Sequence, residues 1–344
     1  MPFVFIISCL ILSQAEVPEK PDPLYIQPFQ TATAIFPGLI LPGSGHFSAG
    51  YREESMDLLV FGGSGLGILA LGGIPAAVSH ASRRFNTVTI PLIIAGAGTW
   101  LVSWYADIFG TTAKGAWAGT EPENVPFQIE GGFVYTKNPL FEFSTFARIA
   151  GFAQWSVFSG MLEMWHALDD SNTRMSAQGR VRLLNRKKDE KEFYSVYLGG
   201  EYWFHRFGTE DFTNKGAAVF LQSRMNLGGL VKTASGSFAS VTVGLGAANT
   251  DYGIEGTSSD EIETLITSGF SMGLYLGKGR GEIELYYNHR HDDFAGGLKL
   301  GISGDGIVGY FGIRGFYEVF EGWAVKWDVA MGSNPVIFLG VARR

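Results

Sequence analysis

Residues 239–246 read Ala-Ser-Val-Thr-Val-Gly-Leu-Gly, a stretch in which apolar side chains alternate with small or polar ones. Successive side chains of an extended strand point to opposite faces, so this period of two predicts a β-strand with one apolar and one polar face. The same alternation recurs between Lys191 and the C-terminus, over residues 194–201, 217–226, 266–276, 282–288, 307–318, 323–329 and 336–342. The second half of the chain is therefore predicted to form eight consecutive strands.

Eight sequential strands predict an antiparallel up-and-down β-barrel. Turn residues separate several of the strands, as at 277–280, 304–306 and 332–335. One face of the sheet is almost free of charge, and the other carries Glu201, Arg224, Glu282, Glu284, Arg314, Glu318, Lys326 and Asp328. This charged face points inward in a membrane barrel and outward in a soluble lipid carrier. Aromatic residues near the strand ends favour the membrane barrel, with the eight charges as an interior network.

The composition points to a membrane as well. The 344 residues include 26 Lys and Arg against 33 Asp and Glu, a net charge of -7, which argues against nucleic-acid binding because phosphates require a basic surface. Charged residues make up 17% of the chain and aromatic residues 14%, whereas an ordinary soluble domain has about 25% charged residues.

The first half of the chain has a helical, apolar pattern. Residues 58–82 and 85–106 contain no Asp, Glu, Lys or Arg, and each stretch is long enough for a membrane span, which takes about 20 residues. Gly63 and Gly67 lie one helical turn apart, a spacing that lets helices pack closely. Residues 146–168 are predicted to form an amphipathic helix. We predict a helical membrane-associated region over 16–170, a basic linker over 171–191 and the barrel over 192–344.

The N-terminus has the pattern of a signal peptide. An apolar run, Phe3 to Leu12, ends in Ser13-Gln14-Ala15, a small-x-small cleavage pattern, so residues 1–15 are predicted to be removed on export. Cys9 is the single cysteine of the chain and also fits a lipoprotein signal. With cleavage after Ala15 the mature chain has no cysteine, which excludes disulfides and Cys-based metal sites.

Two resemblances follow from these residues. The alternating C-terminal half, with mixed charges on its inner face, resembles the small eight-stranded outer-membrane barrels of Gram-negative bacteria. The chain departs from that pattern at its end, where Arg343-Arg344 stands in place of a terminal Phe or Trp. The segment Pro42-Gly43-Ser44-Gly45-His46-Phe47 is similar to the P-G-x-G-[QH]-F segment of a broad group of bacterial membrane proteins, which implies membrane association without an activity.

The sequence contains little sign of catalysis. The tract His289-Arg290-His291-Asp292-Asp293 is dense in metal-binding residue types but lacks a defined ligand set, so neither a metal nor a cofactor is predicted. His205 and Glu201 share a strand face and are the one candidate pair for lipid hydrolysis, with no serine assigned to them. Phosphate-binding, dinucleotide-binding and zinc-protease motifs are absent from the sequence.

These observations predict a non-enzymatic barrel protein of the bacterial outer membrane with a structural, anchoring or interaction role. A lipid-modifying enzyme and a small porin are the alternatives, and a through-pore is not expected because side chains fill an eight-stranded barrel. Membrane lipid is the predicted partner, with self-association through the glycine-rich helices or binding of other envelope proteins as further possibilities. Two apolar helices are typical of the inner membrane and a barrel of the outer one. We expect the helices to pack on each other or on the barrel.

Overall fold

The computed structural model describes residues 28–78, 83–112, 119–122, 124–136, 145–169, 171–188, 191–208, 213–251, 261–289, 310–331 and 335–344. The predicted signal peptide, including Cys9, lies outside the described residues. The same holds for His80 and for residues 290–293 of the His-rich tract.

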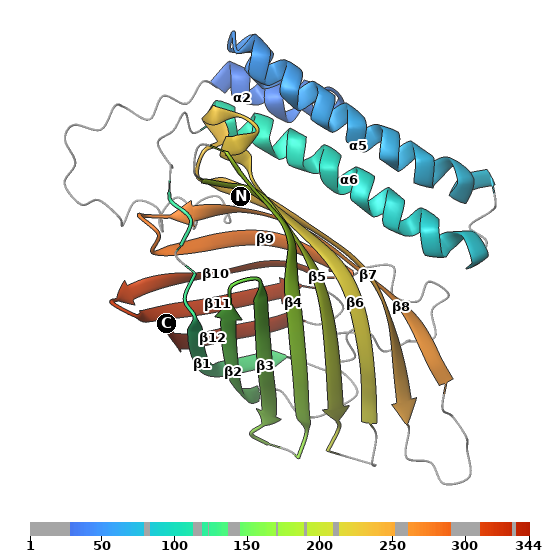
Figure 1. The fold of residues 1–344 in the computed structure, drawn as a ribbon, viewed down its shortest axis with the longest axis vertical. Helices are drawn as coiled ribbons and strands as arrows, with labels where there is room; N and C mark the ends of the chain where they lie inside the picture. Colours follow the sequence, from blue (N-terminus) through green and yellow to red (C-terminus); the bar gives the residue numbers. More distant parts are fainter. Residues whose placement is uncertain are drawn as a thin grey trace.

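Within this part of the chain, twelve strands form one closed antiparallel barrel (Figure 1). Each strand pairs with its neighbours in sequence, and the first strand pairs with the last to close the wall, as in Phe133 opposite Leu339. The strands are β1 (Phe127–Thr136), β2 (Thr145–Trp155), β3 (Phe158–Ala167), β4 (Thr173–Lys188), β5 (Lys191–Arg206), β6 (Thr213–Asn226), β7 (Ser237–Asp251), β8 (Glu261–Leu276), β9 (Gly281–His289), β10 (Tyr310–Phe320), β11 (Trp323–Met331) and β12 (Pro335–Arg343).

The wall has an apolar outside and a polar inside, which is the arrangement of a membrane β-barrel. Leu285 and Leu339 are 47% and 62% exposed on the outside, whereas the adjacent Glu284 is 5% exposed on the inside. The predicted alternation is thereby confirmed, and the eight predicted strands correspond to β5–β12. The predicted turn at 277–280 joins β8 to β9 and contains two glycines at positive φ, Gly277 and Gly279.

The predicted strand count was wrong, because β1–β4 add four strands over residues assigned to helices and a linker. In β3, Met161 and Trp165 line the interior while Leu162 and Met164 are exposed outside. Apolar side chains therefore occur on both faces of β3, and this hides the period of two.

The predicted basic linker is also part of the wall. Residues 173–188 form β4, and three of its arginines, Arg174, Arg180 and Arg182, line the interior. Met175 and Leu183 point outward and are 47% and 52% exposed. Long basic side chains on one face of the strand gave this segment the composition of a solvated connection.

The two predicted apolar helices are present as α5 (Arg52–Val78) and α6 (Arg83–Thr112), and both contain segments long and apolar enough to cross a membrane. Three short helices precede them, α2 (Pro28–Ile35), α3 (Pro37–Ile40) and α4 (Ser44–Ser48). Gly43, at φ +99°, separates α3 from α4. This segment contains Pro28, Pro37 and Pro42, and proline disrupts a helix interior.

Helices α5 and α6 pack against each other through glycines, but not through the predicted pair. A Cβ atom at Gly65 would lie 2.6 Å from the backbone nitrogen of Trp100, and one at Gly96 would lie 2.3 Å from that of Leu69. A Cβ atom at Gly63 or Gly67 would meet nothing within 4 Å. Because 3.6 residues make one turn, the predicted pair lies on the face of α5 that points away from α6.

The helical hairpin lies against the outside of the barrel, over β7 and β8 (Figure 1). Val102, Ala106 and Phe109 of α6 share an apolar core with Ala239 of β7 and with the β6–β7 connection, which contains η1 (Leu227–Gly229) and η2 (Lys232–Ala234). The expected packing of the helices on each other and on the barrel is thus observed.

Candidate functional site

The candidate site is a polar cavity of about 740 Å³ inside the barrel. Its lining includes seven of the eight residues predicted for the interior network: Glu201, Arg224, Glu282, Glu284, Arg314, Lys326 and Asp328. The eighth, Glu318, accepts a hydrogen bond from the backbone N–H of Gly322 at 2.9 Å in the β10–β11 turn. We call this end of the barrel, where β1 begins and β12 ends, the turn end, and the opposite end the loop end.

One ion cluster joins four strands of the wall. The Nη2 atom of Arg148 lies 2.6 Å from Oε1 of Glu130 and 2.5 Å from Oε2 of Glu163. Lys326 donates to the other oxygen of Glu130. All four side chains are at most 27% exposed. Pairing of this kind offsets the cost of removing the charges from water.

A second cluster lies on β9–β11. Nε of Arg314 donates to Oε2 of Glu284 at 2.7 Å, and the hydroxyl of Tyr286 donates to Oδ1 of Asp328 at the same distance. The guanidinium of Arg314 stands 4.8 Å from the centre of the Tyr286 ring. The carboxylates of Glu284 and Asp328 therefore already accept hydrogen bonds from side chains of the wall.

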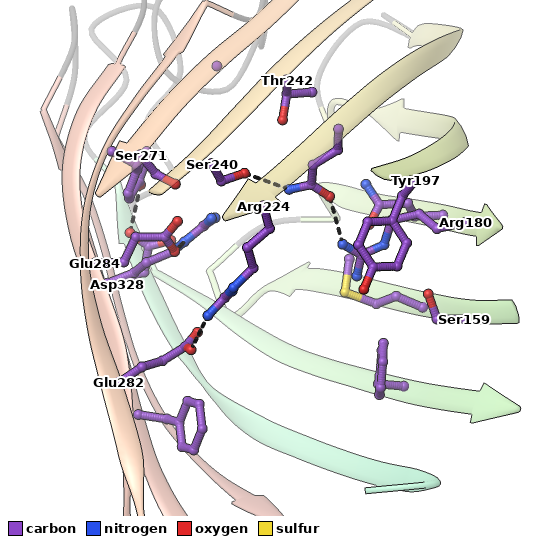
Figure 2. Close-up of a pocket in the computed structure, with 18 of the residues that line it drawn as sticks. Ser159, Arg180, Tyr197, Arg224, Ser240, Thr242, Ser271, Glu282, Glu284 and Asp328 are labelled. Carbon is purple, nitrogen blue, oxygen red and sulfur yellow. Dashed lines mark hydrogen bonds and ion pairs between the residues drawn. The ribbon is translucent and has the colours of Figure 1, made fainter. Parts of the chain in front are cut away.

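Arg224 of β6 reaches across the cavity to β9. Its Nη2 atom lies 2.7 Å from Oε2 of Glu282, an ion pair drawn as a dashed line in Figure 2. The guanidinium also stacks 3.9 Å from the centre of the Phe238 ring. This pair links two wall segments that are 58 residues apart in sequence.

Arg180 of β4 has a different environment. Its Nη1 atom donates to the neutral side-chain oxygen of Gln222 at 3.0 Å, and Gln222 in turn donates to the hydroxyl of Ser240 at 3.3 Å. In Figure 2, Arg180 lies beside Tyr197 on the side of the cavity opposite Glu282. A positive charge whose hydrogen bond goes to an amide remains available to a solute anion.

Apolar side chains narrow the loop end of the interior. Two buried clusters lie on the inner face there, one of Val134, Phe146, Ala167, Phe207 and Phe338, and one of Trp203, Ala218, Ala248 and Leu265. The polar part of the cavity therefore lies between these clusters and the turn end.

A further buried polar group joins the helices to the outside of the barrel. Asp107 of α6 accepts backbone hydrogen bonds from Gly43, Gly45 and His46 at 2.9–3.0 Å. Its Oδ1 atom also lies 2.6 Å from Nδ1 of His46, whose Nε2 atom is 2.6 Å from the hydroxyl of Thr233 in η2. The P-G-x-G-H-F segment noted in the sequence therefore forms the binding site for the Asp107 carboxylate. We call Asp107, His46 and Thr233 the hairpin bridge.

The hairpin bridge has the order of a hydrolase triad, carboxylate, imidazole and hydroxyl, and its carboxylate and imidazole are fully buried. His46 and Asp107 have no exposed surface. A Cβ atom at Gly110 would lie 2.6 Å from Nε2 of His46 and 2.5 Å from the Thr233 hydroxyl, so α6 covers both atoms. The imidazole and the carboxylate are therefore enclosed between α4, α6 and η2, whereas Thr233 is half-buried.

Two other histidines of the wall hydrogen-bond to neighbouring side chains. His205 lies with Nε2 2.8 Å from Asn172 and packs on Phe207 with ring centres 3.6 Å apart, and Nδ1 of His166 lies 2.8 Å from the hydroxyl of Thr173. No group of three or more His, Cys, Asp or Glu side chains in the described part of the chain could hold a metal ion.

Sequence reasoning missed Arg148, Glu130, Glu163 and Arg180, because all four lie on strands that were assigned to a helix or a linker. One signal was present in the sequence. Arg148 and Glu163 are the two residues of the stretch 146–168 that carry a full charge, and they form an ion pair across the β2–β3 hairpin.

No protein-family model matches this chain, and no curated protein matches it in sequence. Among solved structures, the KdgM porin in complex with disordered oligogalacturonate has a TM-score of 0.42 and 10% identity, covering 63% of this chain and 98% of that one. Outer membrane phospholipase A from Escherichia coli has a TM-score of 0.39 and 10% identity, covering 65% and 98%. The Acinetobacter baumannii outer membrane protein Omp33 has a TM-score of 0.33 and 11% identity, covering 64% and 97%.

Proposed function

We propose that this chain is a barrel protein of the bacterial outer membrane and that its lumen is a narrow, porin-like passage for small polar solutes. The observation that carries the proposal is the polar cavity of about 740 Å³ inside a wall whose outer surface is apolar. An apolar outside places the barrel in a bilayer, and a polar inside provides a path for solutes that hydrocarbon excludes.

The strand count removes the main argument against a pore. A barrel's diameter grows roughly linearly with the number of strands, and about eight strands leave an interior that side chains just fill. Twelve strands enclose a wider interior. Here that interior holds several ion clusters and still leaves a cavity.

The charges in the lumen favour the passage of anions. Glu282 and Glu284 are engaged by Arg224 and Arg314, so these carboxylates contribute little free negative charge. Arg180 donates to an amide instead, and Ser240 and Thr242 add hydroxyl groups to the lining. A small anion or an acidic sugar would find a cation and neutral donors along this side of the lumen.

The apolar clusters at the loop end set the expected size of the passage. Hydrophobic constrictions hold water poorly and restrict conduction. We therefore expect a small conductance, with Phe146 and Phe338 among the side chains that limit it.

The test is the current through the purified protein in a planar lipid bilayer. The proposal predicts stepwise conductance with a preference for chloride over potassium, and a shift toward cations in Arg180→Glu. Gln178→Asn, on the same strand and in the same lining, is the matched control that leaves the charge unchanged and should keep the preference for chloride. A current no larger than that of a protein-free bilayer would contradict the channel.

A structural role is the second candidate, and the cross-wall ion pairs favour it. Arg148 and Lys326 tie β1 to β2, β3 and β11, as a rigid anchor in the envelope would require. A protein that folds in vesicles yet passes no current would support this role. Neither candidate involves catalysis, so we expect no hydrolysis of phospholipid by the wild type or by His205→Ala.

A further inference from the structure

The face of α5 that points away from α6 is apolar along its length. Val60, Leu71 and Val78 are 64%, 68% and 77% exposed, and the charged residues of α5 lie at Arg52, Glu53, Glu54 and Asp57 in its first two turns. At 1.5 Å per residue, the uncharged part from Leu58 to Val78 is about 30 Å long. This length matches the hydrocarbon core of a bilayer, which is about 30 Å thick.

The hairpin sits on a surface that itself faces lipid. A Cβ atom at Gly98 of α6 would lie 3.1 Å from Val241 on β7 and 3.5 Å from Phe270 on β8, so the helix approaches the outside of the wall closely. The uncovered part of that wall exposes Leu245 and Leu221 at 43% and 48%. Helix α6 contacts β7, β8 and α5, so the two helices run side by side along the outside of the wall (Figure 1).

The charged residues of the hairpin lie at its two ends. Arg52, Glu53, Glu54 and Asp57 begin α5, and Asp107 lies near the end of α6, where the hairpin bridge reaches Thr233 between β6 and β7. Thr233 marks the turn end of the barrel, and Arg83 and Arg84 begin α6 at the opposite end of the hairpin. Charges at both ends of an uncharged stretch of this length suit a hairpin that crosses a bilayer.

Buried polar groups in such a place must have partners, because hydrocarbon offers none. Asp107 receives three backbone N–H groups and the His46 ring, and Ser103 of α6 donates to the carbonyl of Leu58 at 2.6 Å. The side chains of Asp107 and Ser103 are therefore hydrogen-bonded within the helical segment itself.

We propose that the α5–α6 hairpin is embedded in the bilayer beside the barrel, with the outer face of α5 in contact with lipid acyl chains and the hairpin bridge fixing it to the wall. The occupant of this surface is lipid because the surface is uncharged, has the length of the bilayer core and belongs to a hairpin that packs on the lipid-facing wall. Gly63 and Gly67 lie on the same face and would also face lipid.

The test uses nitroxide spin labels on single cysteines in a Cys9→Ala background, with the full-length protein in phospholipid vesicles. Leu71→Cys reports on α5, Leu285→Cys on the outside of the barrel and Thr242→Cys on the lumen. Collisions with oxygen detect hydrocarbon, and collisions with a water-soluble nickel chelate detect water. The proposal predicts that the label at 71 matches the label at 285, with high oxygen and at least fivefold lower nickel accessibility than at 242.

Each other result overturns the proposal. High nickel accessibility at 71 would place α5 in water. Low accessibility to both reagents would mean that protein covers the face, and spin–spin broadening removed by unlabelled protein would identify a second copy. The labels at 285 and 242 test the barrel separately, and gel mobility before and after heating shows that each variant is folded.

Discussion

Buried polar groups occur on both sides of the barrel wall, and each side stabilises them differently. Inside, Arg148 is held between two carboxylates, and Lys326 neutralises one of them. Outside, the single carboxylate of Asp107 is held by three backbone N–H groups and an imidazole. Opposite charges pair across strands where a polar cavity is present, whereas backbone donors surround the charge where helix packs on wall. Side-chain ion pairs therefore stabilise the buried charges in the lumen, and backbone N–H groups stabilise the buried charge beneath the hairpin.

The largest effect, a failure to assemble, is expected when a charged side chain is placed on the outer face of the wall. Leu285→Arg puts a cation on the lipid face, where it costs about 2–4 kcal/mol near the bilayer midplane, and we expect assembly to fail. Thr242→Arg puts the same side chain into the lumen and should allow folding. Heat-modifiable gel mobility after refolding into vesicles measures both, and equal tolerance would mean that inside and outside are assigned wrongly.

Removing the central cation of the lumen should lower the stability of a barrel that still assembles. Arg148→Ala leaves Glu163 without its ion-pair partner and Glu130 with Lys326 alone, and breaking a buried pair typically costs about 3–5 kcal/mol. Urea unfolding in vesicles measures the loss of stability. Adding Glu163→Gln should recover part of it, and strictly additive effects would show that the two side chains are not coupled.

Weakening the hairpin bridge should cost less. Asp107→Asn removes the charge that four donors share, and one hydrogen bond to a charged group contributes about 1.5–3 kcal/mol. We expect a loss of that size together with faster proteolysis within the hairpin. Asp57→Asn, at an exposed position of α5, is the control and should change stability by less than about 0.5 kcal/mol. Equal effects of the two substitutions would show that the bridge does not fix the hairpin.

The smallest effect is expected at Arg314, whose side chain is 48% exposed and has one carboxylate partner, Glu284. Arg314→Ala leaves that carboxylate partly unsatisfied, at a cost of about 1–3 kcal/mol, and Glu284→Gln in addition should restore part of the loss. A double-mutant cycle by thermal unfolding checks this. A loss of stability as large as that of Arg148→Ala would mean that exposure of Arg314 to the lumen does not reduce the cost of breaking its ion pair.

The sequence predicted β5–β12 because their two faces differ in polarity. In β7, Ser240 and Thr242 face the lumen, and Val241 and Val243 face outward, so a period of two is visible. In β2 and β3, Phe152, Met161 and Trp165 line the interior as well, and Arg148 and Glu163 are the charged residues among their lining side chains. A strand that is apolar on both faces cannot be distinguished from a helix segment by periodicity.

The part of the candidate site that lies on β5–β11 was likewise predictable from the sequence. Seven of the lining charges were identified from β5–β11, whereas Arg180 was missed because β4 has the composition of a linker. The hairpin bridge could not have been found from spacing, since His46 lies 61 residues from Asp107 and 187 from Thr233. The glycines of the P-G-x-G-H-F segment were the available signal, and their role is explained by the close approach of Asp107: a Cβ atom at Gly45 would lie 2.9 Å from its carboxylate.

The central claim is that the barrel interior is a passage for solutes, and thiol block of single channels tests it most directly. In a Cys9→Ala background, Thr242→Cys places a thiol in the lumen and Leu285→Cys places one on the outside of the wall. A membrane-impermeant, charged methanethiosulfonate reagent should reduce the current through Thr242→Cys and leave that through Leu285→Cys unchanged. Absence of current in both unmodified variants, or current through Thr242→Cys that the bound reagent does not alter, would contradict a conducting lumen.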